Sequence, residues 1–367
     1  MNQNKSLLSH LNKFHLQANA KMTIQAGWSM PMTFTDVMQE YDAVTNRAGI
    51  FDLSNLGRIR VRGAGALDLL ERACTADVAR QEDDTTIETL LLNEKAGIID
   101  HCLLTRLDNM WVLTTSAITR EKVLQHLKSL DIPGAKIDDQ TTKVGQVSAT
   151  GPNAKAILDT VLPHKVSELN LGEAKMGSMF IARYIATCSS IRDIWSLDVM
   201  LPNMLIGKAW SYITQKAGSN SITPVGNACR EILRIEAGKP RYGHEISEII
   251  NPQQAGLLNL VKMDHDFLGA EALTKIIEKS PARKRVMLTF EALPTTAVLP
   301  RLGDPIFTSD LGEVGNITSS TLSPQHGEVI AMGYVSSDFA KNNQHLTVNS
   351  ANPINMHVSK IFEAQLA

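Results

Sequence analysis

Residues 226–245 read G-N-A-C-R-E-I-L-R-I-E-A-G-K-P-R-Y-G-H-E and carry the clearest local signals in the chain. Apolar residues recur at helical spacing in the first half, which predicts a helix with one buried face. Gly238, with Pro240 just beyond it, is typical of a helix C-terminus. Arg230 and Arg234 are one turn apart on a neighbouring face. We therefore expect a helix, a stop and a polar turn that together form one wall of a site for an anionic or planar ligand.

Two interpretations of these arginines stay open from the sequence. Arg230 and Arg234 pair with Glu231 and Glu236 on a solvated helix face, or one of them binds a ligand carboxylate through its planar fork of donors. The turn residue His244 has no second histidine four positions further on, so the turn predicts no zinc site. We expect no metal in this protein.

Composition sets limits on the class of protein. The 367 residues are 43% hydrophobic and 20% charged, with a net charge of -2. This is typical of a soluble globular protein of two or three domains, and it argues against a nucleic-acid or membrane-surface partner. The four cysteines form no C-x-x-C pair, and no apolar run approaches the length of a membrane span. We expect a soluble, cytoplasmic protein with reduced thiols.

The order of predicted elements indicates an α+β fold. Residues 1–140 contain a β-β-β-α run, which predicts an N-terminal α+β region with an antiparallel sheet. Residues 141–279 form a second α+β region, and the two regions can interleave along the chain. Beyond the linker K-S-P-A-R-K-R, residues 280–367 show short strands with turn residues between them, which predicts an all-β domain of the β-barrel or jelly-roll type.

Three local expectations follow from residue type alone. Residues 27–32 contain Pro31 and predict a loop or an edge strand, because proline lacks an N–H donor. Residues 188–193 are polar and predict a connection between two strands. Residues 256–262 are apolar and predict a strand.

Residues 98–101 read I-I-D-H and place Asp100 on an apolar strand just after a glycine-containing loop. A carboxylate at this position can anchor a basic nitrogen or act as a general acid or base. Equally, Asp100 can serve only to hold the loop. The sequence contains no P-loop, no G-x-G-x-x-G and no nucleophile elbow.

Several short motifs occur in a fixed order over almost the whole chain. They are G-W-S-M-P at 27–31, A-G-I-F-D-L-S at 48–54, L-N-E at 92–94, G-I-I-D at 97–100, G-P-N-A at 151–154, L-R-I-E-A-G at 233–238, Y-G-H-E at 242–245, D-F-L-G at 266–269 and T-S-S-T-L-S-P at 318–324. With these motifs the chain resembles the aminomethyltransferase family, the T-protein of the glycine cleavage system and its folate-dependent relatives. We identify it as a divergent paralogue.

The resemblance implies a cloverleaf ring of three domains, two mixed α/β domains and a C-terminal all-β domain, with tetrahydrofolate in a central channel. It implies that Asp100 is the catalytic residue beside N5 of the pterin and that Arg230 binds the folate. Ser116 stands where the family often has an asparagine that helps to hold the folate. Tyr242, in the Y-G-H-E turn, is a further candidate contact.

Several positions depart from the family pattern, and the largest departure is a segment. Where the family has G-Y-T-G-E, whose glutamate grips the pterin, residues 185–193 read I-A-T-C-S-S-I-R-D. Asp193 is the candidate to grip the pterin in its place. The resemblance then implies a tetrahydrofolate-dependent transferase. It moves an aminomethyl or methyl group to N5 from a lipoyl carrier protein or from a small methylated amine or sulfonium donor.

The alternative is a non-catalytic folate-binding paralogue with a regulatory or iron–sulfur-maintenance role. Such relatives carry a reactive cysteine in a K-G-C-Y-x-G-Q-E-like segment. The corresponding residues 238–245 read G-K-P-R-Y-G-H-E and contain no cysteine, which favours the transferase.

Overall fold

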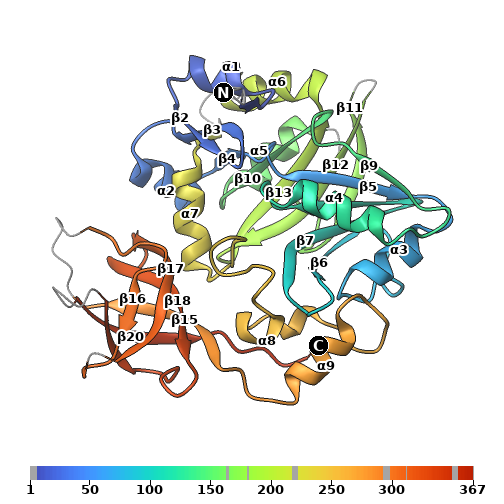
Figure 1. The fold of residues 1–367 in the computed structure, drawn as a ribbon. Coiled ribbons are helices and arrows are strands. Elements are labelled where there is room, and N and C mark those ends of the chain that lie inside the picture. Colours follow the sequence, from blue (N-terminus) through green and yellow to red (C-terminus); the bar gives the residue numbers. More distant parts are fainter. Residues whose placement is uncertain are drawn as a thin grey trace, which may run out of the picture. The chain divides into compact units, whose positions relative to one another are not determined.

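The computed structural model describes residues 6–162, 165–179, 182–216, 222–291, 298–310, 312–348 and 354–366. The chain forms two compact units, and Figure 1 shows its elements in chain order from β1 to β20. Unit 1 comprises Met1–Leu69, Arg80–Ile87 and Cys102–Glu231, and unit 2 comprises Leu70–Ala79, Glu88–His101 and Ile232–Ala367. Domain boundaries near residues 140 and 279 stay a prediction. No helix in the described ranges is long and apolar enough to cross a membrane.

Unit 1 begins with a small mixed sheet of strand order β1-β3-β2, followed by helix α2. Its elements are β1 (Leu7–Leu8), α1 (Asn12–Gln17), β2 (Lys21–Gln25), β3 (Trp28–Thr33) and α2 (Val37–Asn46). The expectation of a loop or edge strand at residues 27–32 was wrong, because β3 is the central strand. Pro31 lies opposite Met22, where the register of β2 shifts, and this irregularity accommodates a residue without an N–H donor.

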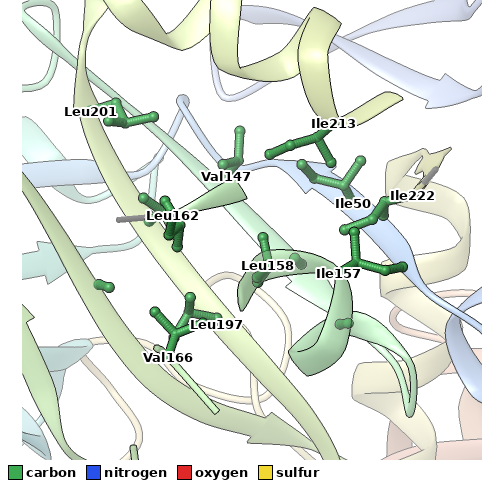
Figure 2. Packing of buried hydrophobic residues seen from close by; sticks show 14 of the residues in the cluster. Ile50, Val147, Ile157, Leu158, Leu162, Val166, Leu197, Leu201, Ile213 and Ile222 are labelled. Atoms are coloured by element: carbon green, nitrogen blue, oxygen red, sulfur yellow. The ribbon is translucent and has the colours of Figure 1, made fainter. Parts of the chain in front are cut away.

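A six-stranded sheet of order β11-β12-β13-β10-β4-β14 forms the centre of unit 1. Only the pairing of β14 with β4 is parallel among these neighbours, so the sheet is mixed. Its strands are β4 (Gly49–Asp52), β10 (Val144–Thr150), β11 (Ala174–Met179), β12 (Ala182–Ile191), β13 (Ile194–Pro202) and β14 (Thr223–Val225). Helices α5 (Ala154–Val161) and α6 (Asn203–Ser211) and the π-helix η1 (Tyr212–Lys216) contribute side chains to the same apolar core. Figure 2 shows Val147 and Leu197 of the sheet with Leu158 of α5 and Ile213 of η1 in this core.

The polar residues 188–193 were expected to connect two strands, but residues 188–191 continue β12 and only Arg192 and Asp193 form the connection. Strand β12 pairs with β13 as far as Ile191 opposite Ile194. Arg192 and Asp193 form a two-residue turn with φ of 54° and 59°, which matches the twist of a tight hairpin. Cys188 packs in the core. A buried cysteine packs as a small hydrophobic residue. The polar residues on either side of Cys188 hid this apolar position in the sequence.

A five-stranded sheet has the order β6-β7-β8-β5-β9, and β6 and β7 contribute residues to both units. Its strands are β5 (Gly57–Arg62), β6 (Thr85–Leu92), β7 (Ile98–Leu107), β8 (Met110–Thr115) and β9 (Lys136–Asp139). Helices α3 (Ala66–Ala73) and α4 (Arg120–Ser129) accompany it in the chain order. The predicted α+β character is confirmed.

Unit 2 ends in a closed barrel of order β15-β18-β17-β16-β19-β20, in which the neighbours pair antiparallel. The strands are β15 (Arg283–Phe290), β16 (Pro305–Phe307), β17 (Glu313–Ser323), β18 (Glu328–Ser336), β19 (His345–Val348) and β20 (Ile354–Ile361). Val286, Ile317 and Val358 belong to its apolar interior. The predicted all-β C-terminal domain is therefore confirmed as a barrel.

In chain order, the segment between β14 and β15 contains α7 (Asn227–Glu236), α8 (Pro252–Ala255), the 3₁₀ helix η3 (Leu258–Leu260) and α9 (Ala270–Ile277). The strand expected at residues 256–262 was wrong, since this segment contains η3. Gly256 ends α8 in the left-handed region at φ 66°, and a Cβ there would lie 2.1 Å from the carbonyl oxygen of Phe362. That turn redirects the apolar residues into a helical turn whose Leu258 is buried.

A buried ion pair gives unit 1 a predicted dependence on pH. His15 Nε2 lies 2.8 Å from Asp52 Oδ2, and both side chains are fully buried. Burial alone would raise the pKa of Asp52, but the hydrogen bond and charge of His15 and the bonds from Ser54 and Ser9 lower it below its usual value. A carboxyl whose pKa is lower in the folded state stabilises the protein above its unfolded pKa of about 3.9.

We therefore expect Asp52→Asn to flatten the fall in the free energy of unfolding as the pH drops below about 4. All four tryptophans belong to unit 1, so urea denaturation followed by tryptophan fluorescence reports this unit. Asp338→Asn, at an exposed turn residue, is the control and should leave the profile unchanged. An Asp52→Asn profile parallel to that of the unmodified protein would contradict the assignment.

Candidate functional site

Contacts within unit 2 fix the start of the strand that carries Asp100. The Ile98 N–H donates to the carbonyl of Ser247 at 3.2 Å. At Gly97 a Cβ would lie 1.8 Å from the carbonyl oxygen of Glu248, so a side chain cannot fit there. Gly97 and Ile98 of the G-I-I-D motif therefore fix the start of β7, and with it the position of Asp100.

Asp100 is fully buried, on the face of β7 that also carries Ile98 and Cys102. Successive side chains of a strand point to opposite faces, so His101 lies on the other face. A buried carboxylate interacts strongly with any proton or base that reaches it, because the local dielectric is lower than that of water. This arrangement suits a general acid or base.

His101, on the opposite face, belongs to a charged cluster. Its Nε2 lies 2.8 Å from Glu88 Oε2, and Lys239 Nζ lies 3.9 Å from Glu88 Oε1. The hydrogen bond from His101 lowers the pKa of Glu88 to about 2, against the effect of burial. Glu88 is therefore ionised throughout the neutral range and balances the charge of the Lys239 ammonium.

In unit 1 a buried glutamate holds the start of the helix that carries Arg230. Glu40 of α2 is fully buried, and its carboxylate accepts backbone N–H groups from Phe34 at 2.5 Å, Thr35 at 2.9 Å and Gly226 at 2.8 Å. Three such donors compensate the burial of a charge. Arg230 follows one turn further along α7 and is partly exposed.

The β12–β13 turn contacts the same helix α2. The Arg192 guanidinium lies 5.4 Å from the centre of the Tyr41 ring and donates a hydrogen bond to the Tyr41 hydroxyl. Asp193, its neighbour in the turn, is exposed. Tyr41 and Glu40 are adjacent residues of α2. This helix therefore contacts both the β12–β13 turn, through Tyr41, and the start of α7, through Glu40.

The remaining candidates occupy two other places. Ser116 follows β8, and its carbonyl accepts the Thr119 hydroxyl at 3.1 Å in the turn that leads into α4. Tyr242 lies in unit 2, where its hydroxyl donates to Glu248 Oε1 at 3.3 Å. The loop of Ser247 and Glu248 thus contacts both the Asp100 strand and Tyr242. Folate contacts of these residues stay predictions.

Arg234 has a partner that the local sequence did not predict. Its Nη1 lies 3.0 Å from Glu245 Oε2, and its Nη2 donates to Ser319 Oγ at 2.6 Å. Glu245 is fully buried and also accepts the Ser319 hydroxyl at 2.6 Å. The second arginine of the opening stretch is therefore part of a buried structural network.

The four cysteines of the chain are all buried, and none of them forms a disulfide. Burial raises the pKa of Cys74 to about 12 and also raises the pKa of Cys188. Reactive thiols are exposed and have low pKa values, so none of these residues suits a nucleophilic role. Over the described residues, no group of His, Cys, Asp and Glu side chains could hold a metal ion.

The fold and these motifs match two family models. Residues 11–265 match the GCVT N-terminal domain, and residues 283–361 match the glycine cleavage T-protein C-terminal barrel domain. The chain belongs to the glycine cleavage T-protein family. Its resemblance to this family and its α+β fold with a C-terminal barrel are confirmed.

Individual relatives are distant but cover nearly the whole chain. The proteins named aminomethyltransferase of Halothermothrix orenii and Chlorobaculum tepidum are each 30% identical, over 92% and 90% of this chain and 94% and 91% of their own. The solved structure of glycine cleavage system aminomethyltransferase T from Bartonella henselae is 27% identical, with a TM-score of 0.87 over 96% of both chains. This divergence is consistent with a paralogue.

Proposed function

We propose that this protein is a one-carbon transferase that moves an aminomethyl or methyl group from a donor to N5 of tetrahydrofolate. The observation that carries the proposal is Asp100, a fully buried carboxylate on a strand whose start is fixed by backbone contacts. Family membership over most of the chain supports it, because the relatives are named aminomethyltransferases.

The side chains proposed as ligand contacts fit the chemistry of tetrahydrofolate. Its pterin presents nitrogen donors and a weakly basic N5, which suit the carboxylate of Asp100. Its tail carries carboxylates, which suit the guanidinium fork of Arg230. Ser116, Tyr242 and Asp193 provide hydroxyl and carboxylate groups for further hydrogen bonds. Tetrahydrofolate, when bound, supplies the nucleophilic nitrogen that accepts the one-carbon unit.

In this proposal Asp100 orients N5 and exchanges a proton with it. The fixed strand start keeps the carboxylate in one position, and its burial excludes water that would compete for the proton. Arg230 binds the folate tail. Because this contact fixes the position of the folate, it also sets the distance between N5 and the donor.

We infer that the donor is the aminomethyl group of a lipoyl carrier protein, and that a small methylated amine or sulfonium compound is the alternative donor. Single-turnover reactions with tetrahydrofolate and each donor in turn separate the two. Formation of methylene-tetrahydrofolate from the aminomethylated carrier, with release of ammonium and of the free lipoyl thiol, supports the first donor. Formation of product only with a small donor supports the second. Tetrahydrofolate binding without product from any donor would refute the transferase.

That last outcome would favour the non-catalytic folate-binding paralogue. Relatives with an iron–sulfur-maintenance role resemble this chain but carry a reactive cysteine. All four cysteines here are buried, which disfavours that form of the alternative. A regulatory role without a thiol predicts binding with no turnover.

Arg230→Gln is expected to weaken tetrahydrofolate binding by about 10- to 100-fold. The range corresponds to the loss of a hydrogen bond to a charged group, about 1.5–3 kcal/mol. Isothermal titration calorimetry measures the change. Arg72→Gln removes an exposed pair with Asp266 at 2.8 Å and serves as the control, with affinity unchanged. Equal affinities of the Arg230 and Arg72 variants would exclude Arg230 from the folate site.

A further inference from the structure

A groove of about 420 Å³ lies within unit 1, between the six-stranded and five-stranded sheets. This volume is in the range of small-molecule sites, about 300–1,000 Å³. The lining comes from β5, β8, β10, β11, β12 and β13 and from the turn between β7 and β8. None of the residues proposed for folate binding lines it.

The floor of the groove is a row of apolar side chains. Met176, Ile185 and Met200 are direct neighbours in register across β11, β12 and β13. The other face of the same sheet, with residues such as Tyr184 and Val199, packs into the apolar core. This row is therefore the side of the sheet left available to a ligand. Methionine side chains adapt to ligands of different shape.

Arginines surround this floor. Arg60 and Arg62 lie two residues apart and so share one face of β5, and Arg183 extends from β12. Arg60 is held by Asp138 at 2.7 Å, whereas Arg62 is exposed. Asp108 is the one acidic residue in the lining, so the groove carries an excess of positive charge.

Two of the predicted folate residues, Ser116 and Asp193, lie at the ends of β8 and β12 opposite to the groove. Met110 begins β8 and lines the groove, while Ser116 follows the other end of that strand. Arg183 is near the start of β12, and Asp193 lies beyond its end. At about 3.3 Å per residue, these separations are roughly 20 and 30 Å along the strands.

We propose that this groove binds a small amphipathic carboxylate, with its apolar chain on the methionine floor and its carboxylate between Arg62 and Arg183. The binding requires both parts of such a ligand. The floor is apolar apart from the weak hydrogen bond that the Met176 sulfur accepts from Arg183 Nη1 at 3.7 Å, and the arginines require an anion. The site acts independently of folate binding.

Calorimetry with decanoate on the full-length protein tests the proposal. We expect saturable binding at one site, and weaker binding of both decanol and inorganic phosphate. The double variant Arg62→Gln/Arg183→Gln should weaken decanoate binding by about five- to tenfold. The effect is modest because both arginines are exposed, and exposed ion pairs contribute little. Met176→Gln should weaken it as well. Arg301→Gln, at an exposed arginine of the barrel unit, is the control and should bind decanoate normally.

A second measurement locates the site directly. Photo-crosslinking with a diazirine-bearing decanoate should label peptides that contain Met110, Met176 or Met200. Displacement of decanoate by tetrahydrofolate, equal binding by the double variant, or label confined to other peptides would each overturn the proposal. Normal tetrahydrofolate binding by the double variant keeps this test separate from that of the folate site.

Discussion

Asp100→Asn is expected to lower the rate of one-carbon transfer by about 10²- to 10⁴-fold, while tetrahydrofolate still binds. This range is what a positioned general acid or base contributes. Asparagine preserves the size of the side chain and can still donate a hydrogen bond, but it cannot exchange a proton at neutral pH. The loss should therefore lie in the chemical step and leave the affinity for the folate almost unchanged.

Single-turnover kinetics and calorimetry on the same preparation separate these two quantities. His101→Gln is the matched control, because His101 is the next residue of β7 but lies on the opposite face, paired with Glu88. We expect a far smaller loss of rate in that variant. If Asp100→Asn transfers at the rate of the unmodified protein, Asp100 has no part in catalysis.

Glu245→Gln is expected to lower the free energy of unfolding of unit 2 by about 3–5 kcal/mol. Removing one partner of a buried ion pair leaves the other charge uncompensated. Arg234 would lose its bond to Glu245 Oε2 at 3.0 Å, and the Arg241 N–H would lose an acceptor at 3.0 Å. Arginine cannot lose its proton to escape this cost.

Differential scanning calorimetry measures this effect, and the exposed pair of Glu271 and Lys275 provides the control. Glu271→Gln should change the unfolding temperature little, because exposed pairs contribute little to stability. Glu245→Gln combined with Arg234→Met should recover part of the loss, since both charges are then removed. Equal unfolding temperatures for Glu245→Gln and Glu271→Gln would contradict the buried network.

Local signals predicted the elements that depend on neighbours in sequence. The helix in residues 226–245 exists as α7, and Gly238 follows its end with φ 66°. The glycine-containing loop before Asp100 also exists, between β6 and β7, where Asn93 Oδ1 accepts the Gly97 N–H at 2.8 Å. In these places a residue's own conformational preference determines the structure.

Contacts with distant parts of the chain determined what the sequence did not predict. Strand β12 continues through polar residues because β13 pairs with it as far as the Arg192 turn. Arg234 can be buried because Glu245, from a turn, and Ser319, from the barrel strand β17, accept its hydrogen bonds. Glu40 gave no signal, since its three backbone donors are brought together only by the fold. A buried glutamate at the start of a helix reads in the sequence as an ordinary surface charge.

The turn between β12 and β13 contains Asp193, the residue predicted to hold the pterin. Residues 185–193 form a regular hairpin whose fixed side chain is the cation Arg192, while the carboxylate of Asp193 is exposed. If Asp193 holds the pterin, it must do so from a solvent-exposed position, where a charge-assisted bond is weakened by water. We therefore expect this chain to depend on Arg230 for most of its folate affinity and on Asp100 for the orientation of N5.

Calorimetric titration of the full-length protein with tetrahydrofolate tests the central claim most directly. A one-carbon transferase of this family must bind its acceptor, and we predict saturable binding at one site with a dissociation constant in the micromolar range, about -8 kcal/mol. The Arg230→Gln variant should weaken this binding, and the Arg72→Gln control should retain it. The absence of binding at high micromolar tetrahydrofolate would contradict both the transferase and the folate-binding alternative.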